Sequence, residues 1–244
     1  MTPAIELNQL TKRYKERTAV DALSLRIGQG EFFSLLGQNG AGKTTTIRML
    51  CGLTPPSGGS ASILGHDIVT DAAAGKALLN VSPQETAVAG KLTVRENIVL
   101  MARLYGAETA AAEKRADALL AEFSLDDRAG EMARRLSGGM QRRLSIAMAL
   151  VTDPRVLFLD EPTLGLDVRA RRELWKHIRA LKGKVTVVLT THYLEEAEAL
   201  SDRIAVLDKG RLKALGTPAE LLARTHTQSL EDAFLQLTET EEEA

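Results

Sequence analysis

A run of three glycines and a lysine, lying between an apolar strand-like segment and an apolar helical segment, constrains this chain most. It reads Gly37-Gln-Asn-Gly-Ala-Gly-Lys43-Thr44 and follows the apolar stretch Glu31 to Leu36. Glycine weakens helices and strands, so glycines here indicate a loop that turns sharply or approaches a ligand closely. The spacing matches G-x-x-x-x-G-K-[ST], a loop whose backbone N–H groups cradle phosphate oxygens.

This loop predicts a nucleoside triphosphate site. The following helix, expected over Thr44 to Leu53, presents its positive N-terminal end to the same anion. Lys43 is expected to reach the β- and γ-phosphates, and Thr44 to offer its hydroxyl to Mg²⁺. The alternative is a tight strand–helix turn with a chance lysine, which does not explain the full motif. The nucleotide-binding residues expected in this loop are Gly37, Gln38, Asn39, Gly40, Ala41, Gly42, Lys43, Thr44 and Thr45.

Two carboxylates follow a second apolar strand-like segment, Val156 to Leu159. Ligands of open α/β sheets bind at the carboxyl ends of the strands, which is where Asp160 and Glu161 would lie. Phosphoryl transfer needs a metal ligand and a group that positions water. We therefore expect Asp160 to hold Mg²⁺ and Glu161 to polarise the attacking water; the alternative is an acidic turn.

His192 follows a third apolar segment, Val185 to Thr190, just as the paired carboxylates follow the second. It is placed to contact the γ-phosphate. A loop histidine that is merely solvated has the same position in the sequence, so the spacing leaves both interpretations open.

Strand and helix patterns alternate along much of the chain, which argues for a parallel sheet covered on both faces. A segment of different composition, rich in Ala, Leu, Glu and Arg, separates the two parts of this alternating pattern and indicates a helical insertion. Its first helix is marked by the capping-box spacing Thr93-Val-Arg-Glu96. The other expected elements are strands at Ile5 to Leu10, Ala19 to Ile27, Ala61 to Leu64 and Leu78 to Val81, helices at Gly138 to Leu150 and Val168 to Leu181, and a hairpin of Ile204 to Leu207 with Leu212 to Leu215.

The stretch Leu136-Ser137-Gly138-Gly139-Met140-Gln141 lies between the glycine loop and the paired carboxylates. Ser137 and two glycines at a helix start form an exposed N–H cluster, although a plain helix cap gives the same pattern. This stretch resembles the signature motif of ATP-binding cassette (ABC) ATPases. The resemblance covers roughly residues 4 to 225, with seven motifs in the family's order.

The resemblance assigns further residues. Tyr14 matches the aromatic residue that stacks on adenine, and Gln84 matches the glutamine that contacts the metal and the attacking water. Asp167 matches the loop that follows the paired carboxylates, and His192 the switch histidine. The ATP-contacting set implied outside the glycine loop is Tyr14, Ser137, Gly138, Gly139, Gln141 and Asp167.

The family implies an α/β fold: a P-loop NTPase (RecA-like) core, a small N-terminal antiparallel β-subdomain and an inserted helical subdomain. We expect residues 1–244 to form a single ABC ATPase domain, with the helical subdomain near 86–150, C-terminal helices near 217–238 and an acidic tail at 239–244. Two copies would pack head to tail. Each ATP would then lie between the glycine loop (P-loop) of one copy and the signature stretch, Leu136 to Gln141, of the other. One set of motifs per chain implies a homodimer.

The C-terminal part resembles ABC-2-type exporters, in stretches such as Gly216-Thr-Pro218 and Ser229 to Phe234. This implies a transmembrane permease supplied as a separate chain, touched by the region from Glu85 to Tyr105. The alternative for that region is a solvated helix face. We find no secretory signal at the N-terminus and no run of about 18 apolar residues. The expected location is therefore cytoplasmic, peripheral at the inner face of the cell membrane.

A soluble ABC ATPase acting on ribosomes or DNA is the alternative function. The net charge of −1 gives no electrostatic case for nucleic acid, so no nucleic-acid partner is expected. The cofactors expected are ATP and Mg²⁺. Cys51, the only cysteine, is expected to be a small buried apolar residue. The pairs Arg134-Arg135 and Arg142-Arg143 are expected to be solvated or paired with acids.

Overall fold

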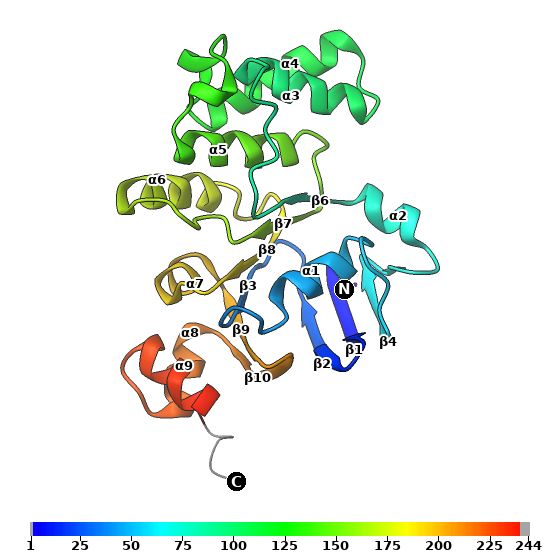
Figure 1. Ribbon diagram of the computed structural model, residues 1–244, viewed down its shortest axis with the longest axis vertical. Coiled ribbons are helices and arrows are strands. Elements are labelled where there is room, and N and C mark those ends of the chain that lie inside the picture. Colours follow the sequence, from blue (N-terminus) through cyan, green and yellow to red (C-terminus); the bar gives the residue numbers. More distant parts are fainter. Residues whose placement is uncertain (1, 240–244) are drawn as a thin grey trace.

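A six-stranded sheet forms the centre of the computed structural model, which describes residues 2–239. Its strand order is β10-β9-β3-β8-β7-β6 (Figure 1). All neighbouring strands are parallel except β9 and β10, which form the predicted hairpin. The strands are β3 (Phe32–Leu36), β6 (Leu79–Ser82), β7 (Val156–Asp160), β8 (Thr186–Thr191), β9 (Arg203–Asp208) and β10 (Arg211–Gly216).

This sheet is covered on both faces, as the sequence predicts for a parallel sheet. Every residue of β3, β7 and β8 is buried. Alternate side chains face opposite sides: Phe32 and Leu157 pack with the helices α5 (Gly138–Ala149) and α6 (Val168–Arg179). Phe33 and Phe158 pack instead with α1 (Lys43–Leu50) and the smaller sheet.

The smaller sheet is antiparallel, with strand order β2-β1-β4-β5, which confirms the N-terminal β-subdomain. Its strands are β1 (Ile5–Tyr14), β2 (Arg17–Ile27), β4 (Gly58–Ile63) and β5 (His66–Asp67). The strand β1 is longer than predicted, because register shifts after Leu7 and Leu10 interrupt the alternation of apolar and polar residues. This sheet lies beside α1, at the right of Figure 1.

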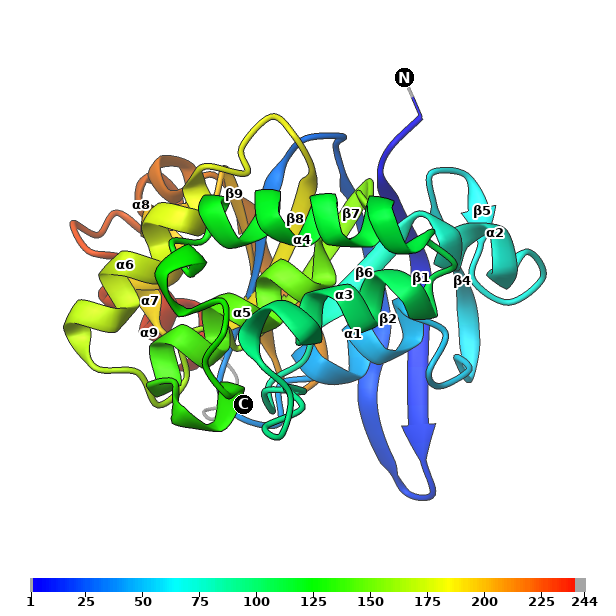
Figure 2. The ribbon, with the colours of Figure 1, turned by 90° about the horizontal axis from the view of Figure 1, so that it is seen from above.

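The helices α3 (Val94–Leu104) and α4 (Thr109–Glu122) lie beyond α5 and α6, at one end of the molecule (Figures 1 and 2). The predicted capping box starts α3: Thr93 Oγ1 accepts from Glu96 N at 3.1 Å, and Glu96 Oε2 accepts from Thr93 N at 2.7 Å. Together with α5 these helices occupy the proposed helical subdomain, about 86–150. Two short helices, α2 (Ala72–Ala77) and α7 (Leu194–Leu200), were not predicted from the sequence.

The chain ends in α8 (Pro218–Thr225) and α9 (Leu230–Glu239), at the opposite end of the molecule from α4. A second capping box, Thr217 with Glu220, starts α8, and Leu230 and Phe234 of α9 are buried. Residues 240–244 of the expected acidic tail lie outside the described part. None of the helices within residues 2–239 combines the length and apolar composition needed to cross a bilayer.

Candidate functional site

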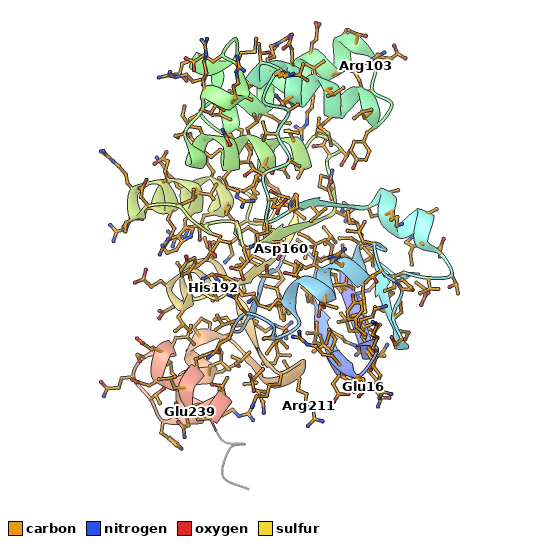
Figure 3. All side chains as sticks on the ribbon, in the orientation of Figure 1. Glu16, Arg103, Asp160, His192, Arg211 and Glu239 are labelled. Atoms are coloured by element: carbon orange, nitrogen blue, oxygen red, sulfur yellow. The ribbon has the colours of Figure 1, made fainter. Side chains whose placement is uncertain are left out.

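The carboxyl ends of β3, β8 and β7 lie side by side and carry the predicted site residues. The glycine loop follows β3, His192 follows β8, and Asp160 with Glu161 ends β7. In the register of the sheet, Leu36 pairs with Thr191 and Asp160 with Thr190. Segments far apart in the chain therefore meet at one edge, where Asp160 and His192 are labelled in Figure 3.

The conformation of the glycine loop requires glycine. Gly42 has φ of 101°, and a Cβ there would lie 2.5 Å from the backbone oxygen of Ala19. Gly37 approaches β9 so closely that a Cβ would lie 2.4 Å from the oxygen of Leu207. These glycines hold the loop in the tight turn that its cradle shape needs.

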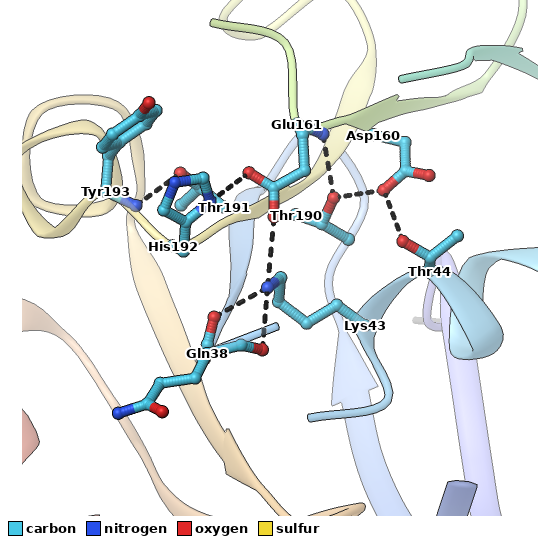
Figure 4. A network of polar contacts seen from close by, with 10 residues as sticks. Gln38, Lys43, Thr44, Asp160, Glu161, Thr190, Thr191, His192 and Tyr193 are labelled. Atoms are coloured by element: carbon cyan, nitrogen blue, oxygen red, sulfur yellow. Dashed lines mark hydrogen bonds and ion pairs between the residues drawn. The ribbon is translucent and has the colours of Figure 1, made fainter. Parts of the chain in front are cut away.

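The loop wraps around the ammonium of Lys43. Lys43 Nζ donates to the backbone oxygens of Gly37 at 2.7 Å and Gln38 at 3.2 Å (Figure 4). It also lies 3.1 Å from Glu161 Oε1. Since a buried charge is costly unless paired, these contacts compensate for the burial of the Lys43 side chain.

Asp160 lies beside the hydroxyl of Thr44. Its Oδ1 accepts from Thr44 Oγ1 at 3.1 Å and from Thr190 Oγ1 at 2.6 Å. A carboxylate and a hydroxyl next to a phosphate cradle are the hard oxygen donors with which proteins bind Mg²⁺, the phosphates supplying further ligands. The residues present therefore fit the expected metal.

Glu161 is held at both of its oxygens. Oε1 faces Lys43, and Oε2 lies 2.8 Å from His192 Nδ1 (Figure 4). Its backbone has φ of 48°, a left-handed conformation that costs about 1–2 kcal/mol for a residue other than glycine. The backbone N–H of Glu161 also donates to Thr190 Oγ1 at 3.0 Å. His192 is thus bonded to the carboxylate, and the interpretation as a merely solvated loop histidine is wrong.

A cavity of about 500 Å³ opens over these groups. It is lined by Tyr14, residues 38–45, Gln84, Glu161 and His192, all predicted. Arg17, Ala19 and Leu164 also line it and were not among the predicted site residues. Arg17 extends over the glycine loop, with Nη2 3.4 Å from the oxygen of Gly40. Tyr14 is 46% exposed, with Lys12 Nζ 5.0 Å from its ring centroid.

The predicted signature residues do not line this cavity. Ser137 and Gly139 line a second hollow of about 400 Å³ together with Asp167. Ser137 caps α5 by accepting from Met140 N at 3.4 Å, and Asp167 caps α6 by accepting from Arg169 N and Ala170 N. The structure therefore brings Ser137, Gly138, Gly139 and Asp167 together at the starts of two helices, away from the glycine loop of the same chain.

Gln141, expected to contact ATP, donates from Nε2 to the backbone oxygens of Ala133 at 3.3 Å and Leu136 at 3.2 Å. Its amide therefore braces the turn before Ser137.

The expectation of a solvated or acid-paired side chain is confirmed for Arg134 and Arg135, which are exposed, but it is wrong for Arg142. Arg142 is buried, and its guanidinium donates to the backbone oxygens of Pro83, at 2.6 Å, and Gln84. Burial lowers the pKa of Arg142. Arg143 donates to the oxygen of Phe123 at 2.8 Å. Spacing along the chain does not reveal the contacts of Arg142, because the oxygens of Pro83 and Gln84 lie 59 and 58 residues away in the sequence.

Burial is the main cause of the raised pKa of a further carboxyl, Glu196, on α7. Its Oε1 accepts from Trp175 Nε1 at 3.1 Å. Burial also raises the pKa of the Cys51 thiol to about 12, with the Asp160 carboxylate adding to the shift. Cys51 is buried, as predicted.

Comparison with known proteins gives a consistent result. A family model described as ABC transporter matches residues 20–164, which include the glycine loop, the signature stretch and the paired carboxylates. The daunorubicin resistance ATP-binding protein of Streptomyces coeruleorubidus is 46% identical, over 91% of this chain and 71% of that protein. The Nod factor export ATP-binding protein I of Ralstonia nicotianae is 45% identical, over 91% of this chain and 69% of that protein.

Solved structures include an ATP binding subunit of an ABC transporter that is 31% identical to this chain. The TM-score is 0.84, and the match covers 96% of this chain and 99% of that one. The likeness therefore extends over nearly the whole chain.

Proposed function

This chain belongs to the ABC transporter family, and on that premise we propose that it is the ATP-hydrolysing subunit of an ABC-2-type exporter. Members of this kind are ATP-binding proteins and ATPases. Its part in transport is to couple ATP-driven dimerisation to movement in a separate transmembrane chain. The observation that supports this most strongly is the position of Glu161, held between Lys43 and His192 at the floor of the glycine-loop cavity.

The loop N–H groups and Lys43 bind the β- and γ-phosphates of ATP. Thr44 and Asp160 hold Mg²⁺, with Gln84 approaching from the cavity wall. Bound there, Mg²⁺ neutralises charge that develops on the phosphate oxygens. The adenine stacks on Tyr14, whose ring is half exposed at the cavity mouth.

Glu161 acts on the water. Lys43 faces Glu161 Oε1 at 3.1 Å, so incoming phosphates compete with this carboxylate for the same ammonium. When the ammonium turns to the phosphates, Oε1 becomes free to accept a hydrogen bond from the attacking water. The water oxygen bonds to the γ-phosphorus, its proton passes to Glu161, and the bond to the β-phosphate oxygen breaks. His192 keeps the other oxygen of Glu161 in place throughout.

A second copy completes each site. Ser137, Gly138, Gly139 and Asp167 lie away from the glycine loop of their own chain, at exposed helix starts. Helix N-termini suit the negative charge of a γ-phosphate. In a homodimer packed head to tail, the signature residues of each copy contact the ATP bound to the other copy. Gln141 supports these residues by hydrogen bonding to the turn before Ser137.

The membrane partner contacts the region from Glu85 to Tyr105. Leu100 and Leu104 of α3, and Tyr105 at its C-cap, are exposed large hydrophobic side chains, and Leu104 is 70% exposed. Arg95 pairs with Asp117 at 2.7 Å, while Arg103 lies at the far end of the helical layer (Figure 3). The names of two relatives, for drug resistance and Nod factor export, support an exporter. The chain then works at the cytoplasmic face of the membrane, attached through this partner.

The test is affinity purification of the tagged chain from gently solubilised host membranes with Mg-ATP present. Recovery of a chain with several apolar segments of about 20 residues supports the exporter and identifies its partner. Reproducible recovery of ribosomal or DNA-associated proteins without such a chain would favour the soluble alternative.

A further inference from the structure

Tyr193 lies against His192, and the guanidinium of Arg171 lies over the ring of Tyr193. We propose that Arg171 is a positioning residue for ATP hydrolysis: it fixes Tyr193, and Tyr193 fixes the imidazole of His192 against Glu161. The inference rests on the proposed roles of Glu161 and His192, and it assigns a task to two residues outside the ATP cavity.

The first contact holds the imidazole. The ring centroids of His192 and Tyr193 are 4.2 Å apart, with the rings inclined at 39°. Tyr193 is itself anchored through its backbone N–H, which donates to Thr191 Oγ1 at 2.9 Å (Figure 4). Since Glu161 bonds only to Nδ1, at 2.8 Å, that bond leaves the ring free to swing about it. The neighbouring aromatic ring removes this freedom.

The second contact holds Tyr193. The guanidinium carbon of Arg171 lies 4.5 Å from the Tyr193 ring centroid, within the range of a cation–π interaction. The Arg171 side chain is only 19% exposed, and its nearest carboxylate, Glu195, is 4.0 Å away and mostly exposed. Arg171 Nε is buried, with no hydrogen-bond partner among residues 2–239. An ion pair therefore does not account for its position, whereas the aromatic ring does.

Arg171 is carried by a helix whose N-terminus is capped. Arg171 lies in the first turn of α6, where its backbone N–H donates to the oxygen of Asp167 at 2.9 Å. Asp167 caps that turn through Arg169 N and Ala170 N, both at 2.9 Å. The cation is thus presented from a capped helix rather than from a loop, which suits a residue that must hold another side chain in place.

Steady-state kinetics of the full chain provide the first test. Arg171→Ala and Tyr193→Leu should each lower kcat by about threefold to tenfold with KM for ATP unchanged, since the phosphate-binding groups are untouched. Tyr193→Phe keeps the ring and should retain the wild-type rate. Arg172→Ala, an exposed arginine on the same helix, is the matched control and should not change kcat.

The double variant Arg171→Ala with Tyr193→Leu separates a shared route from two independent ones. If Arg171 acts through Tyr193, the double variant should be no slower than Tyr193→Leu alone. Multiplied losses would overturn the proposal, and so would an unchanged kcat in Arg171→Ala. Arg171→Lys keeps a cation over the ring and should give a kcat between those of the wild type and Arg171→Ala. It therefore still tests the role of Arg171 if Arg171→Ala folds poorly.

NMR of the imidazole signals tests the positioning itself, independently of activity. The chain has four histidines, and His192→Ala identifies the signal of His192. Arg171→Ala and Tyr193→Leu should both move that signal, because the ring current of Tyr193 is displaced or lost, while Arg172→Ala should not. An unmoved His192 signal in Arg171→Ala would contradict the inference.

The kinetic reference is His192→Ala. If it hydrolyses ATP at the wild-type rate, the proposed role of His192 is wrong, and the NMR result still decides whether Arg171 orders the imidazole. If His192→Ala is slow while Arg171→Ala and Tyr193→Leu are normal, the proposed function stands and this inference is overturned.

Discussion

Lys43 and Glu161 form a buried ion pair, with Nζ 3.1 Å from Oε1 and side chains only 5% and 6% exposed. One belongs to the phosphate cradle and the other is the proposed activator of water. Because the two charges pair inside the protein, we expect nucleotide binding and exposure of the carboxylate to be linked. If the phosphates bind the Lys43 ammonium, Glu161 Oε1 loses this contact and can accept a hydrogen bond from the attacking water instead.

Lys43→Ala should weaken ATP binding by about tenfold to a hundredfold, because it removes a charged hydrogen-bond donor from the cradle. Isothermal titration with ATP measures this directly. Lys91→Ala, which removes an exposed lysine, is the control and should bind as wild type. Undiminished affinity in Lys43→Ala would contradict the assignment of the loop, provided that its thermal unfolding shows a folded protein.

Gly42→Ala should destabilise the fold by more than about 2 kcal/mol and abolish nucleotide binding. It combines a left-handed backbone, φ 101°, with a Cβ 2.5 Å from the oxygen of Ala19. Gly183→Ala is the matched control: its φ is 78°, and among residues 2–239 a Cβ there meets no atom within 4 Å beyond its two chain neighbours. It should cost about 1 kcal/mol and leave ATP binding intact. Denaturant unfolding and nucleotide titration that gave equal results for both variants would refute the argument.

Tyr14→Ala should lower ATP affinity by about tenfold, since stacking of a base on an aromatic ring is worth about 1–3 kcal/mol. Tyr14→Phe keeps the ring and should bind normally. The wild-type chain should also prefer ATP strongly over a pyrimidine triphosphate, and Tyr14→Ala should reduce that preference. Competition against a fluorescent ATP analogue measures all three. Equal binding of both nucleotides to the wild type would remove Tyr14 from the site.

Cys51 should be inert in the native protein. Burial raises its pKa from 9.0 to about 12, so at pH 8 the folded chain holds about a thousandfold less thiolate than the unfolded one. Because the folded value is the higher, the stability this thiol contributes is fully present below pH 9 and is lost as the pH rises toward 12. Reaction with a coloured disulfide reagent, before and after denaturation, checks this; rapid native labelling would contradict it.

The sequence predicted the parts of the fold that depend on local pattern. The glycine loop, the strand-end carboxylates and the Thr93–Glu96 capping box each carry their information within a few residues, and the structure contains them all. The length of β1 was underestimated because bulges interrupt its alternation. The helix α7, at Leu194–Leu200, is too short to show a clear helical period.

Contacts between distant segments could not be predicted in the same way. Arg142 bonds to Pro83 and Gln84, and Arg171 to Tyr193, across separations that no spacing rule reports. A buried arginine and a solvated one look alike in sequence until the fold supplies backbone oxygens or an aromatic ring. His192 is similar: the sequence left its role open, and the 2.8 Å contact with Glu161 decided against the solvated interpretation.

The most direct test of the account is the oligomeric state of Glu161→Gln with ATP, measured by size-exclusion chromatography with light scattering. Glu161→Gln keeps the glycine loop and the signature stretch but removes the carboxylate that we propose polarises water. It should bind ATP, elute with twice the mass of one chain, return to single chains with ADP and hydrolyse almost nothing. Glu113→Gln, at an exposed position on α4, is the control and should behave as wild type. A Glu161→Gln chain that stays single with ATP, or turns it over rapidly, would contradict the account.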